Sequence, residues 1–194
     1  MGTKDISASQ QEGINLINMN NLAIRYRGLV CHAFAELEIY IEQIITSYFC
    51  DTKLKRIELG HRLVGTKDLP FETKKKIVEF ITVQHYSEFK TENPEIFKDL
   101  NFLMEYRNKV AHWKLHSTME DIRNFNGTNV ILATYKTEAH QIKIDKEVIN
   151  DVAINTFITK LQITQLALGK LLNTIEANTP KESDNNPTQG HNEE

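Results

Sequence analysis

The side chains best suited to chemistry lie between Glu105 and Trp113, near the middle of the chain. Arg107 is followed directly by Asn108 and, five residues after the arginine, by His112. This spacing places a permanent cation, an amide and a titratable imidazole within about two turns of a helix. Imidazole changes protonation near neutral pH, and the guanidinium fork matches a phosphate. The segment therefore suits acid–base chemistry at a phosphate.

Cleavage of RNA is one such reaction, because the ribose 2′-hydroxyl is a nucleophile already present in the substrate. The enzyme supplies a base for the hydroxyl proton, an acid for the leaving oxygen and a cation for the phosphoryl oxygens. His112 suits the role of base or acid, and Arg107 suits the role of cation. Asn108 can orient either of these two side chains. This division of labour needs no metal ion, and we predict neither a metal nor a cofactor.

The same spacing from arginine to histidine occurs twice more, at Arg27 to His32 and at Arg56 to His61. With several matches in one chain, the spacing alone is a weak signal. The residue after each arginine distinguishes them, since it is a glycine or an isoleucine in these two cases and a polar asparagine after Arg107. Only the third match keeps all the residue types that the chemistry needs.

Arg107-Asn108-Lys109-Val110-Ala111-His112 resembles the motif of the HEPN superfamily of small all-helical proteins. Ribonuclease members of that family carry Arg, a polar residue, three further residues and His. Phe71 and Lys74 are similar, more weakly, to a pair in the family's second major helix. The resemblance implies metal-independent RNA cleavage in a cleft where the motifs of two protomers meet. It also implies a role in a toxin–antitoxin pair or in antiviral (phage) defence.

Arg107 and His112 fall in one helical pattern, which we expect to begin at Asn93-Pro94. Five residues along an unbroken helix rotate a side chain by about 140°, so the two groups would face different sides. They can meet over one substrate only if the helix ends or bends between them, or if a second protomer completes the site. Asn108 and His112, four residues apart, share a face.

Four further residues are weaker candidates for RNA contact: Lys74, Lys75, Lys109 and Trp113. We expect the lysine run 74–76 on or near the solvent face, where an ammonium group can meet the RNA backbone. Trp113 can stack on a base, although such a tryptophan more often closes a core or a dimer interface.

Structural roles for the motif itself stay open. Arg107 can pair with a nearby carboxylate, and the dipole at a helix C-terminus stabilises His112 without any catalytic duty. His112 and His116 would also form one edge of a zinc site if the helix continued, but no nearby carboxylate or cysteine supplies a third ligand. Cys31 and Cys50 are roughly 28 Å apart on a straight helix, so we expect two reduced thiols rather than a disulfide.

The composition indicates a globular protein rather than a basic nucleic-acid-binding one. The chain has 194 residues, a formal net charge of -3 and a pI of about 6.2, so any RNA contact must be local. No apolar run reaches the length of a membrane span, and the polar N-terminus has no secretory signal. We therefore expect a cytoplasmic protein with no membrane partner.

Periodicity predicts an all-α, HEPN-like helical bundle with a small β-hairpin insertion. We expect residues 1–18 to form a flexible N-terminal arm or a short docking helix, residues 19–177 a single helical domain, and residues 178–194 a disordered tail. The hairpin insertion is expected at about 118–145, with strands at 129–135 and 141–144. Asp145 is expected to cap the last helix, whose apolar stripe would include Val148 and Val152.

The sequence thus predicts a metal-independent endoribonuclease of HEPN type that acts as a homodimer. Its RNA substrate would be a tRNA or an mRNA, and an antitoxin protein is a further expected partner. The alternative is a HEPN-like dimeric module that has lost catalysis and binds a nucleotide, an RNA or a protein. The acidic net charge favours the alternative, and the intact motif favours the enzyme.

Overall fold

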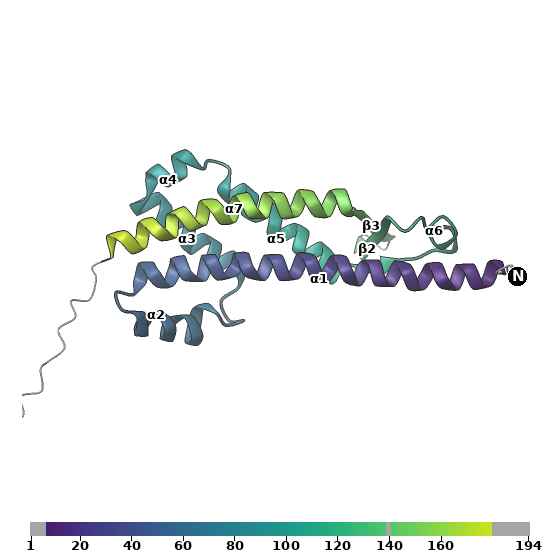
Figure 1. Ribbon diagram of the computed structural model, residues 1–194, viewed down its shortest axis with the longest axis horizontal. Helices are drawn as coiled ribbons and strands as arrows, with labels where there is room; N and C mark the ends of the chain where they lie inside the picture. Colours follow the sequence, from purple (N-terminus) through teal and green to yellow (C-terminus); the bar gives the residue numbers. More distant parts are fainter. Residues whose placement is uncertain (1–6, 139–140, 180–194) are drawn as a thin grey trace, which may run out of the picture. The chain divides into compact units, whose positions relative to one another are not determined.

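The computed structural model describes residues 7–138 and 141–179 (Figure 1). The helices are α1 (Ala8–Phe49), α2 (Lys53–Leu59), α3 (Phe71–His85), α4 (Ser87–Glu92), α5 (Ile96–His112), α6 (Met119–Arg123) and α7 (Asp151–Asn178). A π-helical turn, η1 (Gly60–Val64), follows α2, and the strands are β1 (Lys114–His116), β2 (Asn129–Glu138) and β3 (Gln141–Asn150). This mostly helical fold with one small antiparallel sheet confirms the predicted fold class at that level.

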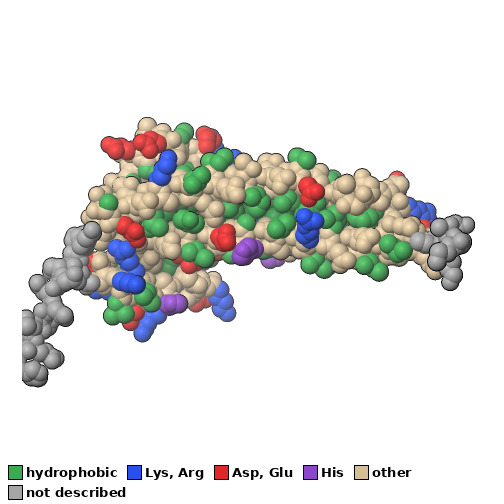
Figure 2. Space-filling model, viewed as in Figure 1, with side chains coloured by type: hydrophobic (Ala, Val, Ile, Leu, Met, Phe, Trp, Pro, Cys, Tyr) green, Lys and Arg blue, Asp and Glu red, His purple; other side chains and the backbone are tan. Residues whose placement is uncertain are grey.

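The described residues form two compact units. The first unit comprises the residues up to Leu37 and Glu95–Gln165, and the second comprises Glu38–Pro94 and the residues from Leu166 on. The first unit contains the motif and the sheet. The second contains α2, η1, α3 and α4, and exposed Lys, Arg and His side chains gather over α2 and η1 (Figure 2). No described helix combines the length and the apolarity that a membrane span requires.

Helix α1 buries one side of its surface, as its periodicity predicts. In the first unit the buried positions recur at three- and four-residue steps: Met19, Ala23, Tyr26, Val30, Phe34 and Leu37. The helix begins at Ala8, so the prediction of a flexible arm is wrong for residues 8–18. Asn15 Nδ2 donates to the Ile122 carbonyl at 2.8 Å, and Arg123 pairs with Glu12 at 2.7 Å, which holds these turns against α6. Residues 1–6 lie outside the described residues.

The three strands form an antiparallel sheet in the order β1-β2-β3. Both hairpin strands were predicted, but each is longer than expected, because pairing extends over the full ten residues from Asn129↔Asn150 to Glu138↔Gln141. Strand β1 was not predicted, since three residues show no alternation of their own. It pairs Lys114 with Ala133 and follows directly after the motif helix. Gly127 adopts a φ of 84° in the predicted turn before β2.

Helix α7 starts five residues later than expected, at Asp151. Asp145 lies within β3 and pairs with Lys136 at 2.6 Å, so the prediction that it caps α7 is wrong. Asn150 takes that role, because its Oδ1 accepts a hydrogen bond from the Ala153 N–H at 2.9 Å. Val148 consequently belongs to a strand, and Val152 is 74% exposed rather than buried. The predicted tail at 178–194 falls, from residue 180, outside the described residues.

Helix α5 begins at Ile96, two residues after the predicted start at Pro94. Asn93 does not cap it. Its Nδ2 instead donates to the Phe89 carbonyl at 2.9 Å and so completes the C-terminus of α4. The buried stripe of α5 consists of Ile96, Leu100, Leu103, Tyr106 and Val110. This stripe fixes which side of the motif helix faces the core.

Lys74 and Lys75 are buried in the second unit, with exposures of 2% and 5%, so the prediction that they lie on the solvent face is wrong. Lys74 Nζ lies 2.7 Å from Glu38 Oε1 and 2.6 Å from Glu42 Oε1, both on α1. Lys75 pairs with Glu72 at 2.7 Å. Buried ammonium groups need such partners, and these carboxylates come from another helix and from the first turn of α3.

Candidate functional site

The motif lies in the last two turns of α5. The helix is continuous from Ile96 to His112, and it ends because Trp113 adopts an extended backbone and donates its N–H to the Lys109 carbonyl at 2.9 Å. No break falls between Arg107 and His112. The rotation of about 140° between the two side chains therefore holds, and the alternative in which the helix ends between them does not apply.

Arg107 is oriented by two contacts. Its Nη1 donates to Asn108 Oδ1 at 3.0 Å, and its Cζ lies 4.7 Å from the centroid of the Phe34 ring on α1. Among the residues that the structure describes, no carboxylate forms an ion pair with this guanidinium. At about 100° per residue, Asn108 and His112 lie within about 40° of each other around the helix. The contact with Asn108 thus directs Arg107 toward the side of α5 that carries His112.

His112 is exposed at the end of α5, and within the described ranges no residue forms a hydrogen bond or an ion pair with it. Its imidazole can therefore accept or donate a proton without first breaking an internal contact. The three predicted catalytic residues all belong to the first unit: a cation held by an amide and a ring, and an exposed imidazole one turn beyond the amide.

The other two arginines of the same spacing are engaged in internal contacts. Arg27 donates from Nε to the Val110 carbonyl at 3.0 Å and from Nη2 to the Trp113 carbonyl at 2.5 Å. Arg56, in the second unit, forms an ion pair with Glu176 at 3.2 Å. Sequence context had already separated Arg107 from these two. The structure adds that each of the two has a structural task of its own.

Arg27 closes the C-terminus of the motif helix. The last carbonyls of a helix have no partner within it, and a cation beside them also meets the negative end of the helix dipole. We predict that Arg27→Ala lowers the free energy of unfolding by about 1 to 3 kcal/mol, because hydrogen bonds from a charged donor are lost. Urea unfolding followed by circular dichroism measures this. Arg27→Lys should recover part of the loss, whereas an unchanged midpoint for Arg27→Ala would contradict the capping role.

Lys109 and Trp113, the weaker candidates of the first unit, contact each other. Lys109 Nζ lies 2.8 Å from Glu147 Oε2 and 5.6 Å from the centroid of the Trp113 ring, which is half-buried. Lys109 therefore already has a carboxylate partner. Their contact with RNA stays a prediction, as does that of the buried Lys74 and Lys75.

His116 does not share a helix face with His112, because α5 ends before it and His116 lies in β1. Its Nε2 is 3.9 Å from Asp121 Oδ2, and this carboxylate also accepts from Thr118 in the capping box of α6. Over residues 7–138 and 141–179, no group of three or more His, Cys, Asp or Glu side chains is placed to hold a metal ion. Cys31 and Cys50 are free thiols.

Tyr106, directly before Arg107, has a feature that the sequence does not reveal. Its ring is stacked between Phe102 and Phe157, at centroid distances of 5.9 and 5.2 Å, and its buried hydroxyl has no hydrogen-bond partner among the described residues. Burial, together with the nearby Glu147 carboxylate, raises the pKa of Tyr106 to about 12. An unpaired hydroxyl can be found only from the folded chain.

We predict that Tyr106→Phe leaves the free energy of unfolding at pH 7 unchanged or raises it by up to about 1 kcal/mol, because a buried, unpaired hydroxyl is removed. The raised pKa has a second consequence. The folded state resists ionisation of Tyr106, so its contribution to stability is complete below the ordinary pKa of about 10 and is lost between about pH 10 and 12. Unfolding at pH 7 and pH 11 measures both effects. A marked loss of stability at pH 7 would show that the hydroxyl has a partner.

The candidate site thus consists of Arg107, Asn108 and His112 on α5, with Phe34 beneath the guanidinium and Arg27 at the helix end. All five residues belong to the first unit. Comparisons of the chain with protein-family models, with curated proteins and with solved structures found no match.

Proposed function

We propose that this protein is a metal-independent endoribonuclease of HEPN type, with Arg107, Asn108 and His112 as its catalytic residues. One observation carries the proposal: Arg107 has an amide and an aromatic ring as partners but no carboxylate among the described residues, and the amide, Asn108, shares a helix face with the exposed His112. If Arg107 served only the fold, we would expect it to bond to main-chain carbonyls, as Arg27 does, or to a carboxylate, as Arg56 does. The resemblance of Arg-Asn-x-x-x-His to the HEPN motif supports the same function.

In the proposed reaction, one His112 imidazole accepts the proton of the ribose 2′-hydroxyl. The 2′-oxygen attacks the adjacent phosphorus, the bond from phosphorus to the 5′-oxygen breaks, and a 2′,3′-cyclic phosphate forms. A second imidazole, in its protonated form, gives its proton to the leaving 5′-oxygen. Arg107 donates to the non-bridging oxygens as negative charge grows on them, and Asn108 orients the guanidinium.

The second imidazole is the reason to propose a homodimer. With about 140° between Arg107 and His112 on a continuous helix, one protomer offers both groups to one phosphate less readily than two protomers do. Two motifs that face each other would line one groove with two guanidinium groups and two imidazoles. We propose tRNA or mRNA as substrate, a role in a toxin–antitoxin pair or in phage defence, and an antitoxin as a further partner.

The pairing of three lysines with carboxylates inside the protein supports a second candidate function. Lys74, Lys75 and Lys109 are each bonded to a carboxylate, and the formal net charge is -3. These features fit a dimeric, HEPN-like module that binds a nucleotide, an RNA or a protein without cutting RNA. Loss of catalysis would leave Arg107 and His112 as contact residues or as parts of the fold.

Expression in bacterial cells separates the two functions. The wild-type chain should arrest growth, and His112→Ala should relieve the arrest if RNA cleavage causes it. His32→Ala is the matched control, because His32 is an exposed histidine on α1 whose Nε2 lies 3.5 Å from Glu36 Oε1. We expect it to arrest growth like the wild type. Equal toxicity of the wild type and His112→Ala, at equal protein levels, would count against cleavage as the cause.

A further inference from the structure

In the first unit, α1 carries an apolar stripe on the side opposite its buried residues. This outward stripe consists of six residues at alternating steps of three and four: Ile14, Ile17, Asn21, Ile24, Gly28 and Cys31. Four of them stand two residues before a buried residue, as Ile24 does before Tyr26 and Gly28 before Val30. Two steps of about 100° rotate a side chain by about 200°, so the stripe points away from the core. Steps of three and four are also the spacing by which two helices pack along each other.

The outward stripe is exposed and carries no charge. Ile14, Ile17 and Ile24 are 42%, 61% and 65% exposed. Over the whole segment 13–24 the chain contains no Asp, Glu, Lys or Arg. The outer face of a surface helix usually carries charged residues, whereas the centre of a protein interface is depleted of them. The stripe therefore fits an uncharged protein surface, and it lacks the cations that hold a nucleic acid.

Further along α1, in the second unit, the same side of the helix has partners within the chain. Glu42 and Thr46 lie eighteen residues, or five full turns, after the stripe residues Ile24 and Gly28. Glu42 accepts a hydrogen bond from Lys74 at 2.6 Å, and Thr46 is only 7% exposed.

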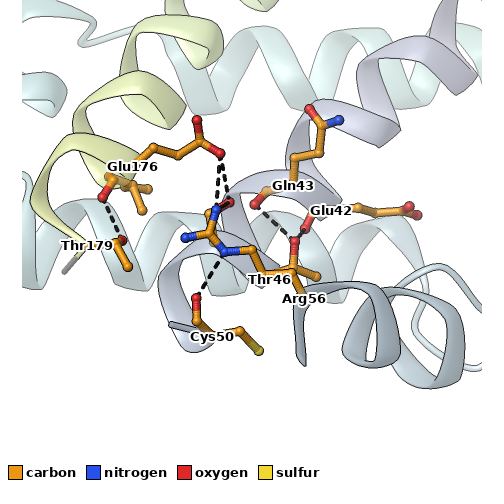
Figure 3. Close-up of polar contacts among 9 residues, drawn as sticks. Glu42, Gln43, Thr46, Cys50, Arg56, Glu176 and Thr179 are labelled. Carbon is orange, nitrogen blue, oxygen red and sulfur yellow. Dashed lines mark hydrogen bonds and ion pairs between the residues drawn. The ribbon is translucent and has the colours of Figure 1, made fainter. Parts of the chain in front are cut away.

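The α2–η1 segment covers Thr46. A methyl group at Gly60 of η1 would lie 3.9 Å from Thr46 Cγ2. As Figure 3 shows, Arg56 of α2 lies beside the end of α1: its Nε donates to the Cys50 carbonyl at 3.1 Å, and its Nη1 donates to Glu176 Oε1 at 3.2 Å. The chain thus covers the polar end of this side of α1 and leaves the apolar stripe exposed.

Gly28 is an exposed glycine in the interior of α1. Glycine weakens a helix relative to alanine, because it loses more conformational freedom on folding. Nothing that the structure describes requires a glycine here, since a Cβ at position 28 would meet no atom within 4 Å. A glycine does allow the backbone of a second helix to approach closely. Its place within the outward stripe therefore indicates that a helix of another molecule packs there.

The sizes of the stripe residues favour a second copy of this chain as the partner. The first half of the stripe has the large Ile14 and Ile17, and the second half has the small Gly28 and Cys31. If two copies pack with their α1 helices antiparallel, Ile17 meets Gly28 and Ile14 meets Cys31. A parallel pair in register would instead set isoleucine against isoleucine and leave a gap at Gly28. We propose that the outward stripe binds a second copy of this chain in the antiparallel arrangement.

The polar residues in and beside the stripe agree with this register. Asn21 would meet Ile24, and the two Asn21 side chains would lie about 4.5 Å apart along the helices, close enough to hydrogen-bond. A single asparagine among apolar residues can fix the register between two helices. Arg25 would face Asn18 of the second copy, so the two arginines do not oppose each other.

This contact is separate from the one proposed for the motif. Phe34, which lies beneath Arg107, belongs to the buried side of α1. None of the stripe residues takes part in the proposed cleavage. The two proposals can therefore fail independently.

Site-directed cross-linking tests the antiparallel arrangement. Ile17→Cys and Gly28→Cys are placed in separately tagged full-length chains that also carry Cys31→Ala and Cys50→Ala. After mixing, a short bismaleimide should join the two kinds of chain, because positions 17 and 28 oppose each other. It should not join two Ile17→Cys chains, whose cysteines would lie eleven residues, or about 16 Å, apart along antiparallel helices. Cross-links between two Ile17→Cys chains, or none in the mixture, would overturn the proposal.

Sedimentation velocity over a range of protein concentrations measures what the stripe contributes to self-association. The wild type should show an association step, and Ile17→Lys should weaken this step about tenfold or more. Ile163→Lys is the matched control, because Ile163 of α7 belongs to the same unit and is 60% exposed, against 61% for Ile17. It should associate like the wild type. Equal weakening by both substitutions would count against the stripe.

Gly28→Leu distinguishes a size-matched contact from a surface that is merely apolar. Leucine favours the helix more than glycine does, and its Cβ has open space within the described chain, so circular dichroism should show an intact fold. In the proposed contact, leucine would collide with Ile17 of the second copy and should weaken association about tenfold or more. Association of Gly28→Leu as strong as that of the wild type, or stronger, would overturn the proposal, as would a wild type that does not associate.

Discussion

Replacement of His112 by alanine is expected to lower the rate of RNA cleavage by about 10² to 10⁴-fold. General acid–base catalysis by one side chain contributes about this much, and in the proposed dimer a single substitution removes both the base and the acid. The fold should not be affected, because His112 is exposed and no described residue bonds to it. Single-turnover cleavage of a labelled RNA, with wild type and variant at equal dimer concentration, measures the loss.

The dependence on pH gives a second measure of the same role. If one imidazole must be neutral and the other protonated, the wild-type rate should pass through a maximum as the pH is varied. The residual activity of His112→Ala should lose this maximum. His32→Ala, the matched control, should keep both the rate and the shape of the profile. Equal cleavage rates for His112→Ala and wild type would show that His112 is not a catalytic residue.

Replacement of Lys74 by alanine is expected to give the largest loss of stability, about 3 kcal/mol. Removal of one partner from a buried ion pair costs about 3 to 5 kcal/mol, and we expect the lower end because Glu38 and Glu42 keep 26% and 24% exposure and can hydrate. Urea unfolding at pH 7 measures the loss. Lys76→Ala is the matched control, since Lys76 is exposed and pairs with Glu72 at a longer 3.6 Å. A loss of similar size in both variants would contradict the special role of Lys74.

The buried triad of Lys74, Glu38 and Glu42 predicts that the free energy of unfolding depends on pH. Burial lowers the pKa of Lys74, but the hydrogen bonds that Lys74 donates to the Glu38 and Glu42 carboxylates outweigh burial and raise the pKa overall. The triad therefore contributes its full stabilisation at pH values below the ordinary pKa of lysine. This stabilisation is lost as the pH rises through the raised pKa of Lys74. A variant with Lys74→Met, Glu38→Gln and Glu42→Gln removes all three charges together. It should recover much of the stability that Lys74→Ala loses.

The helical part of the fold could be predicted because periodicity reports burial directly. The stripes of α1 and α5, and the hairpin after Gly127, follow from the spacing of apolar residues and from turn chemistry. The ends of the helices were less predictable, because a polar residue between two elements can cap either of them. Asn93 completes α4 rather than starting α5, and Asn150 rather than Asp145 starts α7. Such choices depend on contacts made only in the folded chain.

The candidate site was predictable in its residue types but not in its surroundings. Arg107, Asn108 and His112 stand out in the sequence because few other segments combine a cation, an amide and an imidazole. The partners of Lys74 lie 36 and 32 residues away on α1, so this lysine is buried although it belongs to a run that looks solvated. The internal contacts of Arg27 and the unpaired hydroxyl of Tyr106 likewise depend on distant segments.

The central claim is tested most directly by incubation of the purified wild-type chain with total RNA and tRNA in excess EDTA. Arg107→Ala and His112→Ala are assayed beside it, and Arg25→Ala, at an exposed arginine of α1, is the matched control. The proposal predicts that wild type and Arg25→Ala cut RNA and leave 2′,3′-cyclic phosphate ends, while the two motif variants, folded and dimerised to the same extent, do not. Intact RNA with well-folded wild type, or equal cleavage by the motif variants, would contradict a ribonuclease centred on Arg107 and His112.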